Sequence, residues 1–244
     1  MHHEKSFAIV IPLANEAHDF EPFVSQLKIT LDFLKHGRVY LIVDNASRDN
    51  TLSLCQTLSE KDPRFITIFA PENKNVVDAY IRGFKEAYKA GNDFMIEMDA
   101  GLSHDPNQLP RFIELLLNGY ECVFGSRNIS GGSNEESPFM RRFLSYTGTL
   151  ISNLLLGTRL KDMTSGFQGF SRDVVSQFTQ YPLRSTAHFY QTELRYLLRH
   201  YKQIEIPITY RSPSKSVRLK SITNALQTLL FYTWKRFSFQ EIRL

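Results

Sequence analysis

Cysteine, tryptophan and long apolar runs are all scarce in this 244-residue chain. The two cysteines, Cys55 and Cys122, argue against a disulfide-stapled secreted scaffold, and we expect buried reduced thiols in a cytoplasmic protein. No stretch reaches the roughly 18 uninterrupted apolar residues of a membrane-spanning helix. The apolar run before Pro12 is too short for the core of a signal peptide. We therefore expect a chain that does not cross a bilayer by itself.

Charge of one sign is also scarce, because 29 basic and 25 acidic residues leave a formal net charge of only +4. This excess is too small to indicate nucleic acid binding, whereas it suits a phosphate-bearing ligand or an anionic membrane face. The apolar fraction of 42% is ordinary for a folded protein. We expect one large α/β domain over 1–215 and an amphipathic C-terminal segment over 216–244.

Short apolar runs alternate with amphipathic segments of helical length. The runs are rich in Val, Ile and Phe and end in Pro, Asn, Asp or Gly, which is typical of buried strands. The predicted strands are 7–12, 39–45, 65–71, 94–100 and 121–127, and the predicted helices are 19–36, 49–61, 76–90 and 107–118, with Asp49 and Asn107 as caps. The alternation indicates a Rossmann-like, mostly parallel central sheet flanked by helices, with ligands bound outside the carboxyl ends of the strands.

Past residue 130 the pattern changes to a loop, helices over 139–157 and 187–200, and a strand over 203–210. The stretch 216–237 is amphipathic, with basic residues near both ends. Its apolar residues at helical spacing are Leu219, Ile222, Leu226, Leu229 and Leu230, with Trp234 and Phe237 beyond. Such a helix is typical of one lying on an anionic membrane, although packing on the domain or on a partner subunit explains the same pattern.

Polar side chains collect where the predicted strands end. They are Asn15 and Glu16, Asp44 and Asn45, Asp99, and Ser126 and Arg127. Asp99 is typical of a site that holds a metal–phosphate group, yet position 101, where a second carboxylate is usual, is Gly101. For Glu16 and Asp44 a structural role remains open, because acidic side chains also cap helices and turns.

Seven segments in a fixed order carry a family resemblance. They read "IVIPLANE", "IVDNASRDNT", "EMDAGLSHDP", "FGSR", "DMTSGFQGFSR", "YQTE" and "EIPITYR". In order and spacing, over about residues 6–215, they resemble inverting glycosyltransferases of family 2 with the GT-A fold. The most similar branch is that of dolichol-phosphate mannose synthases and bacterial polyprenyl-phosphate glycosyltransferases. Each motif alone is unspecific, whereas the ordered set identifies the family.

The resemblance implies a nucleotide-sugar donor such as GDP-mannose or a UDP-hexose. The residues it assigns to this donor are Pro12, Ala14, Glu16, Asp44, Asn45, Asp99 and Gly101. Asp99 would hold the sugar-diphosphate and a divalent cation, Mg²⁺ or Mn²⁺, and Gly101 would make that cation weakly bound. Ala14, Asn45 and the stretch 73–80 also depart from the family pattern, so the nucleotide base stays open.

The resemblance implies a polyprenyl or dolichyl phosphate as acceptor, used by a peripheral enzyme at the inner face of the membrane. A phosphate monoester has a second pKa near 6, so its oxygen is anionic at neutral pH and needs cations rather than a general base. The residues assigned to the acceptor phosphate are Arg127, Arg141, Arg211 and Lys215. The loop that shapes the sugar and acceptor site comprises Asp162, Thr164, Ser165, Gly166, His188 and Gln191. Glu193 would stand near the sugar, and the catalytic set would be Asp99, Arg127, Arg141 and Glu193.

Other functions remain open at this stage. A hydroxyl acceptor on a glycan, lipid or protein would require a carboxylate base, and 185–195 holds no clear Glu-Asp pair. Gly101 favours a degenerate domain that binds nucleotide without catalysis. A sugar nucleotidyltransferase would carry a glycine-rich, basic loop after the first strand, unlike "PLANEAHD". A membrane-protein partner is a further expectation.

Overall fold

The computed structural model describes residues 5–134, 139–211 and 219–244. Its strands are β1 Phe7–Leu13, β2 Gly37–Val43, β3 Phe65–Phe69, β4 Phe94–Glu97, β5 Cys122–Ser126, β6 Gln168–Ser171 and β7 Gln203–Pro207. Its helices are α1 Phe20–Phe33, α2 Thr51–Lys61, α3 Val76–Lys89, the 3-10 turn η1 Pro106–Gln108, α4 Leu109–Leu117, α5 Phe139–Leu156, α6 Arg172–Phe178, α7 Tyr190–Leu197 and α8 Leu219–Phe237.

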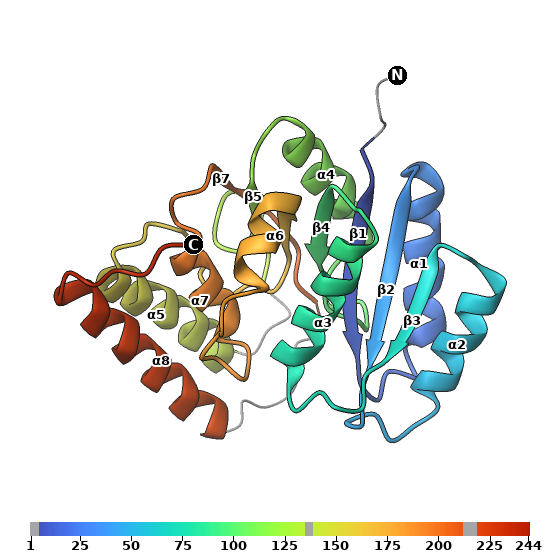
Figure 1. Ribbon diagram of the computed structural model, residues 1–244, viewed down its shortest axis with the longest axis horizontal. Helices are drawn as coiled ribbons and strands as arrows, with labels where there is room; N and C mark the ends of the chain where they lie inside the picture. Colours follow the sequence, from blue (N-terminus) through green and yellow to red (C-terminus); the bar gives the residue numbers. More distant parts are fainter. Residues whose placement is uncertain (1–4, 135–138, 212–218) are drawn as a thin grey trace.

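The described strands form one sheet in the order β3-β2-β1-β4-β6-β5-β7 (Figure 1). The strand β6 is antiparallel to both of its neighbours, and the other pairs are parallel. The mostly parallel, Rossmann-like sheet expected from the sequence is confirmed. No strand was expected at β6, which is short and contains glycine, a poor strand former.

Both faces of the sheet are covered, which explains why its strands are apolar throughout. Ile9 and Ile11 of β1 pack in a core with α1, α2 and α4, whereas Ala8 and Val10 pack on the opposite face with α3, α6 and α7. Alternate residues of one strand thus enter two cores. The two cysteines are free and buried in these cores, as expected.

The predicted helices and their caps are reproduced with local differences. Asp49 accepts a hydrogen bond from the backbone N–H of Thr51 at 3.1 Å, but the N-cap position of α2 is Asn50, whose side chain makes no capping bond. The expectation for Asn107 was wrong, because Asp105 is the capping side chain and accepts from the N–H of Asn107 at 3.0 Å. The helix expected over 187–200 is shorter and spans α7 only.

Helices α5, α7 and α8 form a separate corner of the molecule, where α5 and α8 run side by side (Figure 1). Leu156, Tyr196, Leu229 and Tyr232 are buried between them. The guanidinium of Arg236 on α8 donates to backbone carbonyls at the end of α5. Within the described residues, no helix combines the length and the apolar character that crossing a membrane demands.

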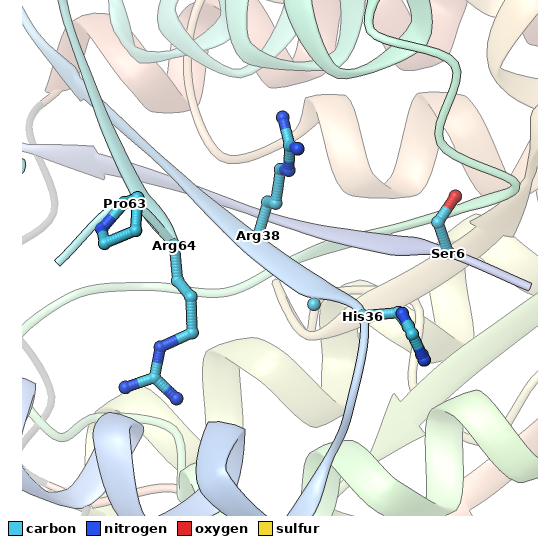
Figure 2. A pocket seen from close by; sticks show the side chains of 6 residues that line it. Ser6, His36, Arg38, Pro63 and Arg64 are labelled. Carbon is cyan, nitrogen blue, oxygen red and sulfur yellow. The ribbon is translucent and has the colours of Figure 1, made fainter.

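Two surface hollows lie away from the carboxyl end of β4, where Asp99 is found. One, of about 330 Å³, is lined by Ser6, His36, Gly37, Arg38, Pro63 and Arg64 (Figure 2). These residues stand at the amino ends of β1, β2 and β3, the edge opposite to the one where parallel sheets bind ligands. The other, of about 440 Å³, lies between 182–184 and α8. Neither hollow is the site predicted from the sequence.

Candidate active site

Asp99 lies just past β4, and its carboxylate is oriented by α3. The hydroxyl of Tyr80 donates to Asp99 Oδ1 at 2.6 Å. Burial opposes ionisation, but the neighbouring His104 and the Tyr80 hydrogen bond outweigh it, so the pKa of Asp99 is lowered. The carboxylate keeps about a third of its surface exposed. Asp99 is therefore an ionised, fixed acceptor at the ligand edge of the sheet.

His104 is the second residue that positions Asp99. The backbone N–H of Asp99 donates to His104 Nδ1 at 3.0 Å, so the proton of the neutral ring sits on Nε2. That nitrogen lies 3.9 Å from Asp99 Oδ2. The ring is fully buried and stacks on Phe167, and burial lowers the pKa of His104. The imidazole thus binds the backbone N–H of Asp99 and lies next to its carboxylate.

A buried polar chain continues behind Tyr80. The rings of Tyr80 and Tyr190 stack with centroids 5.3 Å apart, and the Tyr190 hydroxyl donates to Glu97 at 2.5 Å. Gln168 donates to the other oxygen of Glu97 at 2.9 Å. Burial raises the pKa of Glu97 well above its usual range. Glu97 thus ties β4 to β6 and α7 beneath the site.

The loops after β1 and β2 carry residues that the sequence assigns to the donor, and hydrogen bonds join the two loops. The N–H of Asn15, which has φ 61°, donates to Ser47, and Asn15 Oδ1 accepts from the N–H of Arg48. Asp44 accepts from the N–H of Ala46 at 2.8 Å. Asn45 donates to the carbonyl of Pro71. These bonds fix the loop shapes, so the turn-forming role left open for Asp44 is present in the structure.

Glu16 reaches from the β1 loop toward the end of β4. A Cβ added to Gly101 would lie 2.8 Å from Glu16 Oε2. Burial and the negative charges of Asp19 and Asp99 raise the pKa of Glu16. Pro12 and Ala14 belong to the same segment, with Pro12 in β1 and Ala14 exposed in the loop. Two carboxylates, Asp99 and Glu16, thus stand at this edge.

Oxygen donors of this kind suit Mg²⁺ or Mn²⁺, which are hard cations. In the described residues, however, no group of three or more His, Cys, Asp or Glu side chains is arranged for a metal. The donor set fits a cation only if a ligand such as a diphosphate supplies further oxygens.

Arg127 and Asp162 form the centre of the acceptor half. Arg127 Nε and Nη2 donate to the two oxygens of Asp162 at 2.7 and 2.9 Å, and both side chains are nearly fully buried. Although burial alone would raise it, the Arg127 guanidinium lowers the pKa of Asp162. Arg127 also donates to Ser145 of α5 and to Thr164. The predicted residues Arg127, Asp162 and Thr164 are therefore brought together by a bidentate ion pair.

The side chain of Arg195 binds the backbone of the loop 162–166. Its guanidinium is fully buried and donates to the carbonyls of Asp162 and Ser165. It also donates to Gln168 at 3.2 Å. Ser165 and Gly166 thus sit on a loop whose backbone is fixed by a buried cation.

Gly166 lets this loop approach Asp99. A Cβ there would lie 3.5 and 3.6 Å from the two Asp99 oxygens and 3.2 Å from Gln191 Nε2. Gln191 is 2% exposed, and its Oε1 has no hydrogen-bond partner among the described residues. His188, exposed before α7, is close enough to help lower the pKa of Asp99. The structure therefore brings Gly166, Gln191 and His188 to Asp99.

Glu193 does not fit the role expected near the sugar. Its side chain is fully buried, and its two oxygens accept from the N–H groups of Arg184 and Ser185, both at 2.8 Å. The Tyr232 hydroxyl of α8 donates to it at 2.7 Å. With its oxygens engaged, Glu193 joins α7 to α8 and presents no carboxylate to a ligand. We correct its assignment to a structural one.

Of the remaining acceptor cations, Arg141 begins α5 and acts electrostatically on Tyr210. Arg211 lies 3.7 Å from Asp105, and its N–H donates to the carbonyl of Ser103. Lys215 lies outside the described residues.

The residues of the site that were missed in the sequence are Tyr80, Glu97, His104, Ser145, Arg195 and Tyr210. The Tyr210 ring lies beside both His104 and the guanidinium of Arg127. The signal available for Tyr210 was its place in the "EIPITYR" motif, whereas Tyr80 lies on the amphipathic helix α3 and Arg195 on α7, whose residues are all buried.

Comparisons with known proteins identify the family of this chain. The family model described as "Glycosyl transferase family 2" matches residues 8–179. The chain is 30% identical over 203 residues to an undecaprenyl-phosphate mannosyltransferase from Micrococcus luteus, covering 82% of each chain. It is 27% identical to a polyprenol monophosphomannose synthase from Mycolicibacterium smegmatis, covering 91% of this chain and 83% of that one.

A similar solved structure supports the fold. It is glucosyl-3-phosphoglycerate synthase from Mycobacterium tuberculosis in complex with Mn²⁺, UDP and glucosyl-3-phosphoglycerate, with a TM-score of 0.64. It is 14% identical, and the match covers 96% of this chain and 80% of that one. With the family model matching most of the chain, the protein belongs to glycosyl transferase family 2.

Proposed function

We propose that this glycosyltransferase transfers a sugar from a nucleotide-sugar to a polyprenyl phosphate at a membrane surface. The observation that carries the proposal is that α5 contributes both a polar side chain to the site and exposed apolar side chains. Ser145 on this helix binds Arg127 and Thr164 of the polar cluster, while Phe139 and Phe143 on the same helix are exposed. A lipid phosphate needs this combination, a polar site for its head and an apolar surface for its chain. The names of the curated relatives support the same acceptor class.

The chemistry needs cations and no general base. The acceptor phosphate is anionic at neutral pH, and its oxygen would attack the anomeric carbon as the nucleoside diphosphate leaves. Arg141 and Arg211 are the described cations for this phosphate, with Lys215 a further candidate. Arg127 is committed to Asp162, so it shapes the phosphate site and adds positive potential to it.

On the donor side, Asp99 would hold the sugar-diphosphate. When bound there, a divalent cation would neutralise charge on the leaving diphosphate. The M. tuberculosis neighbour crystallised with Mn²⁺ and UDP supports the presence of such an ion in this fold. GDP-mannose and UDP-hexoses remain the candidate donors.

The proposed location is the cytoplasmic face of a membrane. On α8 an apolar stripe faces solvent and consists of Ile222, Leu226, Leu230, Trp234 and Phe237. The opposite side of α8 packs on the domain through Leu229 and Tyr232. The buried face of α8 thus packs on the domain, and its exposed stripe supports the proposed contact with a membrane.

The proposal is tested by supplying radiolabelled GDP-mannose or UDP-glucose with undecaprenyl phosphate in vesicles, or with a water-soluble hydroxyl acceptor. We expect label in the lipid phosphate. Arg141→Ala should raise KM for the lipid at least about tenfold, the scale of one charge-assisted hydrogen bond, while nucleotide affinity in calorimetry stays unchanged. Arg38→Ala, at the opposite sheet edge (Figure 2), is the matched control. Transfer to the hydroxyl acceptor alone would overturn the proposal, and lost nucleotide binding in Arg141→Ala would move that residue to the donor side.

A further inference from the structure

Position 101 lacks a side chain, and the space beside it is filled by a carboxylate from another loop. Gly101 has φ 70°, in the left-handed region that glycine adopts readily. A Cβ on this residue would lie only 2.8 Å from Glu16 Oε2. The Glu16 carboxylate therefore stands where a side chain at position 101 would project.

The Glu16 carboxylate is held there by its backbone, and its charge has no counterpart in the described residues. Its N–H donates to Thr51 Oγ1 at 2.9 Å, which fixes the loop on α2. Its carboxylate oxygens accept no hydrogen bond from the described residues.

A second, independent feature points to a ligand at the same place. Gln191 is 2% exposed, and its Oε1 has no hydrogen-bond partner in the parts of the chain that the structure describes. A Cβ added to Gly166 would lie 3.2 Å from the Gln191 Nε2 atom and 3.5 and 3.6 Å from the two Asp99 oxygens. Buried amide oxygens without partners are rare in folded proteins. An oxygen acceptor left unsatisfied beside Asp99 indicates a group that binds there.

We infer that Glu16 supplies the second carboxylate of a divalent-cation site, from the loop after β1, in place of the one missing at position 101. The site would comprise Asp99, Glu16 and oxygens of the donor diphosphate. One or two carboxylates with substrate phosphates are a common arrangement for Mg²⁺. This inference rests on the proposed nucleotide-sugar donor, but it does not depend on which acceptor is used.

The test is calorimetric and spectroscopic. Mn²⁺ binding is measured by calorimetry and by electron paramagnetic resonance, with the metal alone and with UDP or GDP present. Wild type should bind Mn²⁺ tightly only with a nucleotide, and Glu16→Gln should weaken that binding at least about tenfold, as for loss of a metal-site group. Glu21→Gln, an exposed residue of α1, is the matched control and should bind as wild type does.

A double variant tests whether a carboxylate at position 101 restores the Mn²⁺ binding that is lost with Glu16. In Glu16→Ala/Gly101→Asp the obstructing carboxylate is removed, and aspartate is among the residues that best tolerate a positive φ. We expect this double variant to bind Mn²⁺ with nucleotide more tightly than Glu16→Ala does. Equal Mn²⁺ affinity in wild type and Glu16→Gln would overturn the inference. The inference would also be overturned if Glu16→Gln lost nucleotide affinity to the same extent with and without EDTA. Glu16 would then contact the nucleotide itself. If wild type binds Mn²⁺ with nucleotide but transfers no sugar to the lipid phosphate, the proposed acceptor is wrong and the metal-site inference stands.

Discussion

Asp99 owes its orientation to residues on either side of it in the fold. Tyr80 of α3 donates to its carboxylate, and His104 accepts from its backbone N–H. Asparagine at position 99 would keep an oxygen for the Tyr80 hydroxyl and the same backbone bond. Asp99→Asn therefore removes the negative charge while leaving the local structure in place, which makes it a clean probe of the charge.

We expect Asp99→Asn to lose at least about 2–3 kcal/mol of transition-state stabilisation, the scale of one preorganised electrostatic group. This corresponds to a fall in kcat/KM of roughly 30- to 150-fold, measured as sugar transfer to the lipid phosphate. Asp93→Asn is the control, because Asp93 pairs with Lys5 at the opposite edge of the sheet. Near-native turnover in Asp99→Asn would show that the donor site lies elsewhere.

The candidate site was only partly accessible from the sequence. Asp99, Asp162, Thr164 and Gly166 lie within motifs or at strand ends, where parallel topology dictates that they meet. Arg195 could not be found this way, because its role arises from a loop about 30 residues away that wraps around its guanidinium. The same reasoning failed for Glu193, where a motif match did not reveal that the side chain turns inward to α8.

At the scale of elements, the Arg127–Asp162 pair joins the end of β5 to the loop before β6. Both groups are nearly fully buried, so removing one partner leaves an unpaired buried charge. The most predictable elements were the long apolar strands and amphipathic helices. The strand β6 escaped prediction because its four residues, with glycine among them, carry too little periodicity, and it is defined by pairing with β4 and β5.

Asp162→Asn should lower the free energy of unfolding by about 3–5 kcal/mol at pH 7, the usual effect of breaking a buried ion pair. The pKa of Asp162 is depressed in the folded state, so its contribution is complete above the unfolded value of about 4 and declines as pH falls through the folded pKa. Urea unfolding of both proteins at pH 7, 5 and 3 measures this difference, which should shrink in acid.

Asp32→Asn is the control for Asp162→Asn, because Asp32 forms a solvent-exposed pair with Arg64. We expect it to change the free energy of unfolding by at most about 1 kcal/mol. A loss in Asp162→Asn that is as large at pH 3 as at pH 7 would assign the effect to packing rather than to charge.

At the scale of the whole molecule, exposed apolar side chains gather on α5 and α8, which lie together at one end of the molecule (Figure 1). On α5 they include Phe139, Met140, Phe143, Leu144, Tyr146, Leu150, Ile151 and Leu154. Many exposed apolar side chains on two neighbouring helices indicate an interaction surface, whereas scattered single residues do not. The basic side chain of Lys235 near the end of α8 suits anionic lipid headgroups.

We therefore expect the protein to sediment with vesicles that contain phosphatidylglycerol, and to do so less at 1 M salt because screening weakens the electrostatic part. Leu230→Glu/Trp234→Glu removes two exposed apolar side chains without touching the packed side of α8. If each is buried in the lipid interface, the loss should be at least about 2 kcal/mol, or roughly thirtyfold in vesicle affinity.

Ile29→Glu/Phe33→Glu is the matched control, because these residues are equally exposed but lie on α1, away from α5 and α8 (Figure 1). Equal loss in both variants would mean that general hydrophobicity, and not the α5–α8 surface, drives the association. Loss confined to the α8 variant, with nucleotide affinity unchanged, would assign the lipid contact to the exposed face of α8.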